Sequence, residues 1–131
     1  LLLLYGAGLR RGEAMRLKAK VWVKAYLRRC ASHGAMGVVV RHGDDDAGAI
    51  YIKVLRGDGL CALFGPAPAG LEDADFDRRW VAMLKGAFVS EEEVRTRIER
   101  EARIDSDLWL LEIEDRDGKH FLGDDLLETK S

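Results

Sequence analysis

Cysteine and histidine side chains at four positions have a spacing that could bind a metal ion or supply a nucleophile. Cys30 and His33 are three positions apart, which would place a thiol and an imidazole on one face of a helix, as in half of a zinc site. His42 and Cys61 would complete four ligands only if their segments folded over that helix. No oxyanion motif or glycine-rich phosphate loop accompanies these residues, so we expect no metal, no cofactor and no nucleophilic catalysis. We interpret both cysteines as reduced core residues.

A run of basic residues near the start of the sequence has the composition of a phosphate-binding surface. Trp22 and Tyr26 lie within it, as a surface that follows a phosphate backbone and stacks on bases would require. However, solvated helix faces are normally charged, and the aromatic side chains are more simply explained as core residues. We therefore expect the run to meet solvent, or acidic segments of its own or another protein, in preference to nucleic acid. The candidate contact residues are Lys18, Lys20, Lys24, Arg28 and Arg29.

A cluster of carboxylates in the last third of the sequence is the other candidate for chemistry. Paired carboxylates act as general acid and base when they are buried. Glu112 and Glu114 fall on one face of a predicted strand, opposite Trp109 and Ile113, and that face is expected to meet solvent. We therefore predict no catalytic residue and expect that the protein is not an enzyme. The cluster comprises Asp105, Asp107, Glu112, Glu114, Asp115 and Asp117.

The composition indicates a single globular domain. The chain has 131 residues, of which 47% are hydrophobic and 34% charged, and its formal net charge is -2. These values exclude a globally basic nucleic-acid-binding protein and an acidic tail protein. No apolar stretch approaches the roughly 20 residues of a membrane-spanning helix, and no targeting signal is recognisable. We expect a soluble, cytoplasmic protein without a membrane partner.

The first half of the sequence predicts one helix and three strands. Alternation after Arg16 favours a short extended segment, and the apolar spacing that follows predicts a helix over Trp22–His33. Three apolar segments then alternate with turn-forming Gly and Asp residues, which predicts an antiparallel meander. The predicted strands are Met36–His42, Gly48–Leu55 and Leu60–Phe64.

Two further helices are predicted in the second half. Phe76, Trp80 and Leu84 recur at helical spacing and indicate a helix that begins at residue 73 or 75 and ends at residue 86. Ser90 and Glu93 form a capping box, in which each residue's side chain bonds the backbone of the other, and this predicts the start of the next helix.

The chain is predicted to end in a hairpin. Its strands are Leu108–Asp115 and Lys119–Leu122, and residues 123–131 are expected to form a frayed acidic tail. We thus predict an α+β fold: an antiparallel sheet of about five strands, the meander plus the hairpin, with about three helices packed on it. Trp80 and Trp109 are expected to meet in one shared interior. Residues 15–122 are predicted to form the domain, with residues 1–14 as an extension outside it.

The segment Tyr5-Gly6-Ala7-Gly8-Leu9-Arg10 is followed by Glu13. With these residues, residues 1–17 resemble the first active-site box of tyrosine recombinases, in which an apolar helix leads into a phosphate-binding arginine. In those enzymes the arginine stabilises the pentavalent phosphate together with a second arginine, in a His-x-x-Arg box, and a tyrosine nucleophile near the C-terminus. The sequence has neither of these partners, because its last tyrosine is Tyr51. We therefore expect no recombinase activity. The matching residues are Tyr5, Gly6, Gly8, Leu9, Arg10 and Glu13.

Three features of residues 16–122 occur together: Trp22 with the segment 25–29, Gly43-Asp44 with Ala47-Gly48, and the segment 104–115. In these features residues 16–122 resemble an uncharacterised alphaproteobacterial family, the domain of unknown function numbered 1491. It implies a compact domain and transfers no catalytic residue.

Taken together, these features leave the function unknown and favour a small soluble binding or interaction module of unknown partner, for which another protein and a second copy of the chain are the candidates. Two alternatives remain open. One is an accessory protein that meets nucleic acid through the basic run, and the other is a small enzyme whose site is assembled from residues distant in the sequence.

Overall fold

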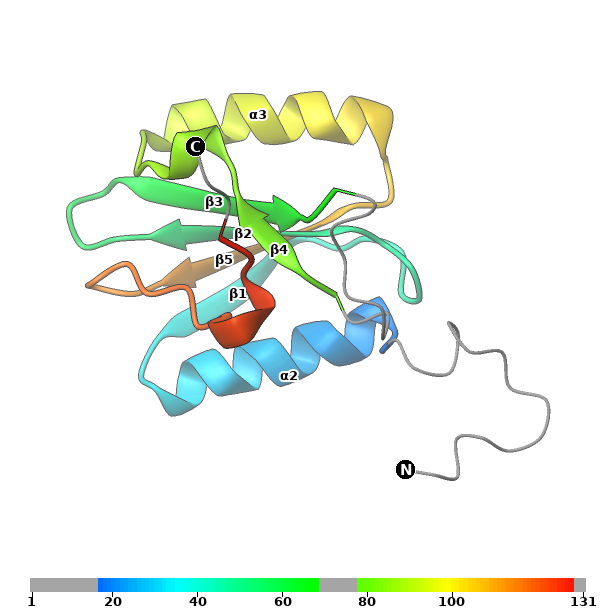
Figure 1. Ribbon diagram of the computed structural model, residues 1–131, viewed down its shortest axis with the longest axis horizontal. Helices are drawn as coiled ribbons and strands as arrows, with labels where there is room; N and C mark the ends of the chain where they lie inside the picture. The colour runs from blue at the N-terminus through cyan, green and yellow to red at the C-terminus, as the bar shows by residue number, and fades with distance from the viewer. Residues whose placement is uncertain (1–16, 69–77, 129–131) are drawn as a thin grey trace.

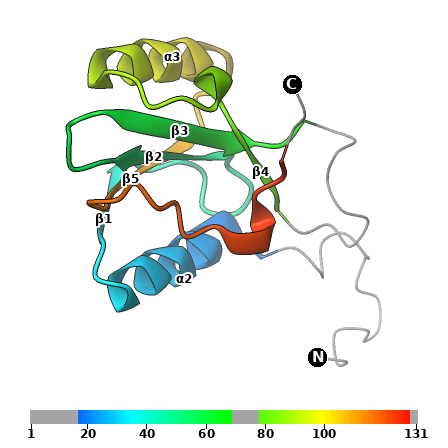
Figure 2. The ribbon, with the colours of Figure 1, turned by 60° about the vertical axis from the view of Figure 1, so that its left-hand side comes forward.

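In the computed structural model, residues 17–68 and 78–128 are described, and they form a three-layer structure. A five-stranded sheet lies between helix α2 (Ala19–Ser32) on one face and helix α3 (Glu91–Ile104) on the other (Figure 1; Figure 2). The fold class is therefore α+β, with two α-helices among the described residues instead of about three. The strands are β1 (Met36–Arg41), β2 (Ile50–Leu55), β3 (Cys61–Pro66), β4 (Trp80–Ala82) and β5 (Trp109–Glu114).

The strand order, β1-β5-β2-β3-β4, corrects the predicted meander. The β2–β3 hairpin forms as expected, but β5 lies between β1 and β2, antiparallel to β1 and parallel to β2. The sheet is therefore mixed, not purely antiparallel. The loop after β1 reaches the start of α2, where its carbonyls at Asp45 and Asp46 accept hydrogen bonds from the N–H groups of Lys20 and Ala19 (2.9 and 3.0 Å).

These two hydrogen bonds also explain why α2 begins at Ala19, where a short extended segment was expected. The first N–H groups of a helix have no partner within it, and here a distant loop satisfies two of them. The buried face of α2 comprises Ala19, Trp22, Val23, Tyr26 and Cys30. The apolar spacing therefore located the helix correctly, whereas its first turn depends on a tertiary contact.

Trp80 lies in strand β4, so the helix predicted up to residue 86 is wrong over the described residues; residues 69–77, including Phe76, lie outside them. The strand pairs with β3 through Phe64↔Ala82 and Pro66↔Trp80. The Trp80 indole N–H donates to the carbonyl of Ile50 (2.9 Å), and its ring lies 4.3 Å from that of Trp22. Trp80 is apolar because it is buried against the sheet, and its spacing from Leu84 does not mark the face of a helix.

The end of the chain crosses the α2 side of the sheet and does not form the predicted second strand of a hairpin. Phe121 has a φ of 55°, which is incompatible with a strand. Its carbonyl and that of His120 accept hydrogen bonds from Arg29 (2.7 Å) and Tyr26 (2.6 Å). Residues 123–125 form a short 3-10 helix, and the N–H of Leu127 donates to the carbonyl of Trp80 (2.8 Å). Residues 123–128, expected to be part of a tail, thus continue along the sheet.

Each face of the sheet has its own core. Trp80 and Trp109, each 2% exposed, belong to the core under α2, which confirms their expected shared interior. The core under α3 comprises Tyr51, Cys61, Leu63, Val94, Ile98, Leu108 and Leu110. Neither helix of the described residues is long and apolar enough to cross a membrane.

Ser90→Ala tests the capping of α3. The Ser90 hydroxyl accepts a hydrogen bond from the Glu93 N–H (3.1 Å), as the capping box predicts. Loss of this cap should reduce the free energy of unfolding by about 1 kcal/mol in chemical denaturation. Ser90→Thr retains the oxygen and should stay close to the unsubstituted protein. Equal losses in the two variants would contradict a role for the cap.

Candidate interaction surface

Strand β1 lies at one edge of the sheet, and no described segment pairs with its outer side. Apolar side chains along it are exposed: Met36 is 67% exposed, Val38 51%, Val39 40% and Val40 54%. An edge strand with unpaired main-chain groups and apolar side chains is a template for pairing with another chain. This is the largest concentration of exposed apolar residues among those described.

The hydrogen bonding of β5 shows which main-chain groups of β1 point outward. The N–H groups of Trp109 and Asp115 donate to carbonyls in and beside β2 (2.7 and 3.0 Å), so alternate residues between them also face β2. The intervening residues of β5 face β1, where Glu114 pairs with Met36 and Glu112 with Val38.

It follows that the peptide groups of Gly37 and Val39 face away from β5. Each presents an N–H donor and a carbonyl acceptor at the outer edge of the sheet.

A β-bulge limits this edge at one end. The register with β5 skips between Val39 and Arg41, so Val40 is the extra residue. The Arg41 guanidinium turns to the carbonyl of Ser106 (3.1 Å). The regular part of the edge is therefore Met36–Val39, and we call these residues the β1 edge.

Helix α2 lies beside the β1 edge and brings part of the predicted basic run to it. Leu27 marks the side of the helix that faces β1, because a Cβ on Gly37 would lie 2.7 Å from its side chain. Lys20 and Lys24 lie on the same side of the helix as Leu27 at i, i+4 and i+7 spacing, and Arg28 lies one turn beyond Lys24. All three basic side chains are exposed. We call Lys20, Lys24 and Arg28 the basic stripe.

The other two predicted contact residues are not part of the basic stripe. The Arg29 guanidinium donates to the Phe121 carbonyl, on the flank of α2 that meets the end of the chain, whereas Lys18 is the N-cap residue of α2 and lies 3.9 Å from an Asp46 oxygen. The five predicted residues thus do not form one surface. Trp22 and Tyr26 are 7% and 0% exposed, which confirms the interpretation of both as core residues. A nucleic-acid surface with these rings as stacking platforms is not formed.

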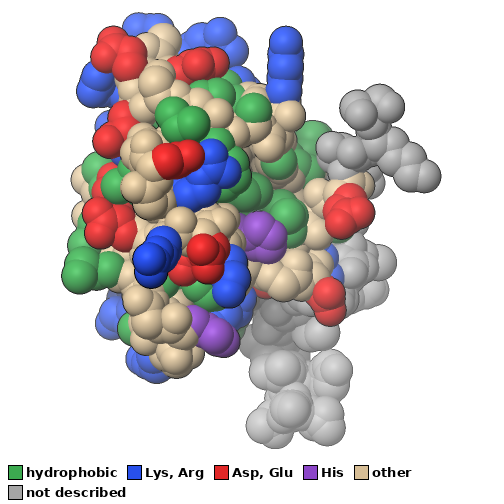
Figure 3. Space-filling view, turned by 90° about the vertical axis from the view of Figure 1, so that its left-hand side faces the viewer, with side chains coloured by type: hydrophobic (Ala, Val, Ile, Leu, Met, Phe, Trp, Pro, Cys, Tyr) green, Lys and Arg blue, Asp and Glu red, His purple; other side chains and the backbone are tan. Residues whose placement is uncertain are grey.

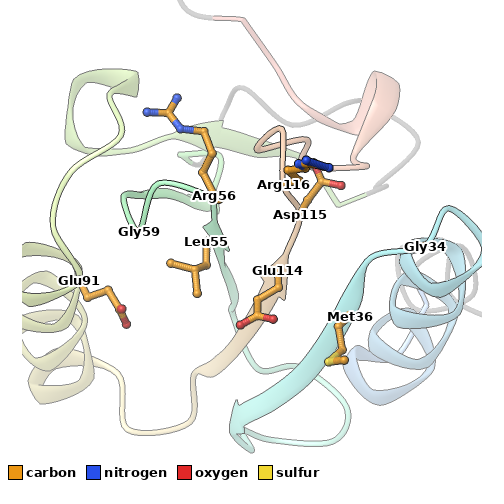
Figure 4. A pocket seen from close by; sticks show the side chains of 10 residues that line it. Gly34, Met36, Leu55, Arg56, Gly59, Glu91, Glu114, Asp115 and Arg116 are labelled. Carbon is orange, nitrogen blue, oxygen red and sulfur yellow. The ribbon is translucent and has the colours of Figure 1, made fainter.

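A cavity of about 500 Å³ lies at the carboxyl ends of β2 and β5, close to the start of β1 (Figure 4). Leu55, Glu114 and Met36 lie along its floor, with Glu91 of α3 on one side. Side chains of both charge signs meet at this end of the molecule (Figure 3). Arg56 is already engaged, since it pairs with Asp58 (2.8 Å) and lies over the Phe88 ring (3.9 Å).

Lys53 forms a cluster with two carboxylates that sequence reasoning missed. Its amine lies 3.0 Å from Glu91 and 3.2 Å from Glu112, and its side chain is 12% exposed. Burial would lower the pKa of Lys53, but the hydrogen bonds to both carboxylates outweigh burial and raise it. The Lys53 amine thus joins α3 to β5 through its two carboxylate partners. Glu112 was expected to face solvent; its side chain is instead only 25% exposed.

The cysteines and histidines with metal-ligand spacing are separated in the fold. Cys30 lies in the core under α2 and Cys61 in the core under α3, and burial raises the pKa of both thiols. His33 is exposed, and His42 hydrogen-bonds Asp45 (2.8 Å) while its ring packs on Trp109. Within residues 17–68 and 78–128, no three His, Cys, Asp or Glu side chains gather in an arrangement that could hold a metal ion.

Comparison with known proteins identifies the family. The family model described as "Protein of unknown function (DUF1491)" matches residues 17–123. The chain belongs to the DUF1491 family. Comparison with curated proteins gives no match. The DUF1491 match begins at residue 17, so it does not extend to the segment that resembles a recombinase box, and residues 1–16 lie outside the described structure.

Two solved structures show how far the DUF1491 fold extends. A DUF1491 family protein from Caulobacter crescentus CB15 is 38% identical, with a TM-score of 0.70, and the match covers 85% of this chain and 97% of the other. A protein from A. tumefaciens is 37% identical, with a TM-score of 0.74, and the match covers 88% and 98%. Both structures share the overall fold of this chain, and the sheet and both helices lie within residues 17–123, the segment that the family model matches.

Lys53→Met tests the charge cluster. Removal of the ammonium leaves the half-buried Glu112 without its cation, and we expect the free energy of unfolding to fall by about 2 kcal/mol. In Lys53→Met/Glu112→Gln the uncompensated carboxylate is gone, so most of that loss should be recovered. Chemical denaturation of both variants and of Glu112→Gln measures the coupling. Additive losses would show that the two side chains do not interact.

Proposed function

We propose that the protein is an interaction module that binds an extended segment of a partner protein by strand addition at the β1 edge. The observation that carries this proposal is the outward orientation of the Gly37 and Val39 peptide groups between exposed apolar side chains. In strand addition, main-chain hydrogen bonds supply affinity, and side chains on alternate sides of the added strand supply specificity. The β1 edge offers both.

The small size of the edge sets the expected strength of the interaction. Only two residues present outward peptide groups before the bulge at Val40, so the added segment is short. A short segment that must also lose conformational freedom binds weakly unless its side chains contribute. The role fits reversible association better than permanent assembly.

Two features of the cores support a cytoplasmic site of action. Cys30 and Cys61 are free thiols on opposite faces of the sheet, where they cannot form a disulfide with each other. Free thiols without a disulfide partner are typical of a reducing compartment. We place the module there, as a single domain that begins near residue 15.

Val39→Pro tests strand addition without breaking the sheet. Proline removes the outward N–H of Val39, which makes no hydrogen bond to β5, so the fold should lose less than about 1 kcal/mol. Val38→Pro, one residue away, removes an inward N–H and should cost about 1–3 kcal/mol. The pair distinguishes outward from inward positions by chemical denaturation alone. Equal destabilisation would contradict the assigned orientation.

Binding is measured by NMR titration with synthetic strand-forming peptides of six residues, the length of β1, that alternate valine with a second residue type. We expect the amide resonances of Gly37 and Val39 to shift, and the Val39→Pro protein to give no saturable binding. Shifts confined to Arg56, Glu114 and Arg116, which line the cavity at the ends of β2 and β5, or unchanged binding to Val39→Pro, would refute strand addition.

A further inference from the structure

We infer that the segment added at the β1 edge alternates acidic and apolar side chains, with the acidic ones on the α2 side of the sheet. The inference rests on the proposed strand addition and names the chemistry of the partner. It follows from the unlike surfaces that flank the edge on the two faces of the sheet.

The α2 side of the edge is positively charged. Side chains at Gly37 and Val39 positions point to this face, since a Cβ on Gly37 would meet Leu27 and Ile113. Beyond Leu27, on the side away from β5, lie the basic side chains of α2. The helical spacing places Lys20 and Lys24 nearest to β1. An added strand therefore places every second side chain beside these cations.

The loop after β1 contributes the other charged groups on this side. Asp45 is exposed and accepts a hydrogen bond from His42. That hydrogen bond, and to a smaller extent the nearby Lys20 and Lys24, hold the pKa of Asp45 below its usual value. Asp45 thus lies near two cations of the basic stripe, Lys20 and Lys24, and Asp46 of the same loop is paired with Lys18, so the basic stripe keeps an excess of positive charge.

The α3 side of the edge is apolar, with acidic groups behind it. Met36 and Val38 point to this face, because neighbouring residues of a strand alternate. On β5, the next strand inward, Glu114 is exposed beside Met36, and Glu112 is paired with Lys53. Apolar side chains of a partner pack on Met36 and Val38, whereas acidic ones on this side meet the carboxylate of Glu114.

The same charges argue against a second copy of the chain as the occupant. Antiparallel pairing of two β1 edges would place both α2 helices on one side of a continuous sheet. The two basic stripes would then face each other across the junction. Juxtaposed like charges disfavour such a contact, so the surface fits an acidic partner better than itself.

A matched set of peptides tests the charge preference. Fluorescence anisotropy at low salt compares a six-residue peptide that alternates valine and glutamate with one that alternates valine and lysine. We expect the glutamate peptide to bind about ten-fold more tightly, since it forms up to three exposed ion pairs with the basic stripe. Added salt should reduce the difference.

Charge reversal of the basic stripe supplies the second arm. The variant Lys20→Glu/Lys24→Glu/Arg28→Glu should prefer the lysine peptide. The variant Arg95→Glu/Arg100→Glu/Arg103→Glu carries the same change in net charge on the exposed face of α3 and should keep the preference for glutamate. Circular dichroism verifies that both variants are folded.

The outcomes separate this inference from the proposed function. Equal binding of the two peptides, abolished in both cases by Val39→Pro, overturns the acidic preference and leaves strand addition intact. The same loss of preference in both charge-reversed variants also overturns it, because net charge alone would then explain the effect. Binding of neither peptide, or binding that survives Val39→Pro, overturns strand addition itself.

Discussion

The fit of the loop 43–48 around Trp109 is the contact on which the arrangement of this molecule depends. The indole N–H of Trp109 donates to the carbonyl of Asp44 (2.8 Å), and His42 packs on the ring with 4.1 Å between centroids. A Cβ on Gly43 would collide with the Asp107 carbonyl and with the indole, so the loop approaches β5 only because this residue is glycine. The same loop supplies the carbonyls that begin α2. One strand end, one loop and one helix start are thus fixed together.

Sequence patterns located those elements that local interactions determine. The capping residues Ser90 and Glu93 lie in one short segment at the start of α3, and the glycines and aspartates of the β2–β3 turn act within a few residues. The order of the strands in the sheet could not be predicted from such local patterns. The insertion of β5 between β1 and β2 depends on burial against residues distant in the sequence. Trp80 shows the same limit, because its helical spacing to neighbouring aromatics did not reveal its pairing with β3.

The basic run is one stretch in the sequence, but which of its residues lie beside β1 depends on the position of β1 relative to Leu27, which the sequence does not show. The exposure of β1 could not be predicted from its sequence, because three consecutive valines without polar alternation are equally typical of a buried strand. The ion pairs of Lys53 could not be predicted from the sequence, because its partners Glu91 and Glu112 come from α3 and β5.

The position of β5 in the sheet bears on how the chain assembles during synthesis. The strand that joins β1 to β2 is the last of the five to leave the ribosome. Until it emerges, β1 has no neighbour on either side, and both rows of its peptide groups are open to water and to other chains. A nascent chain therefore exposes more of this valine-rich segment than the finished molecule does, and unpaired apolar segments of this kind are prone to aggregate.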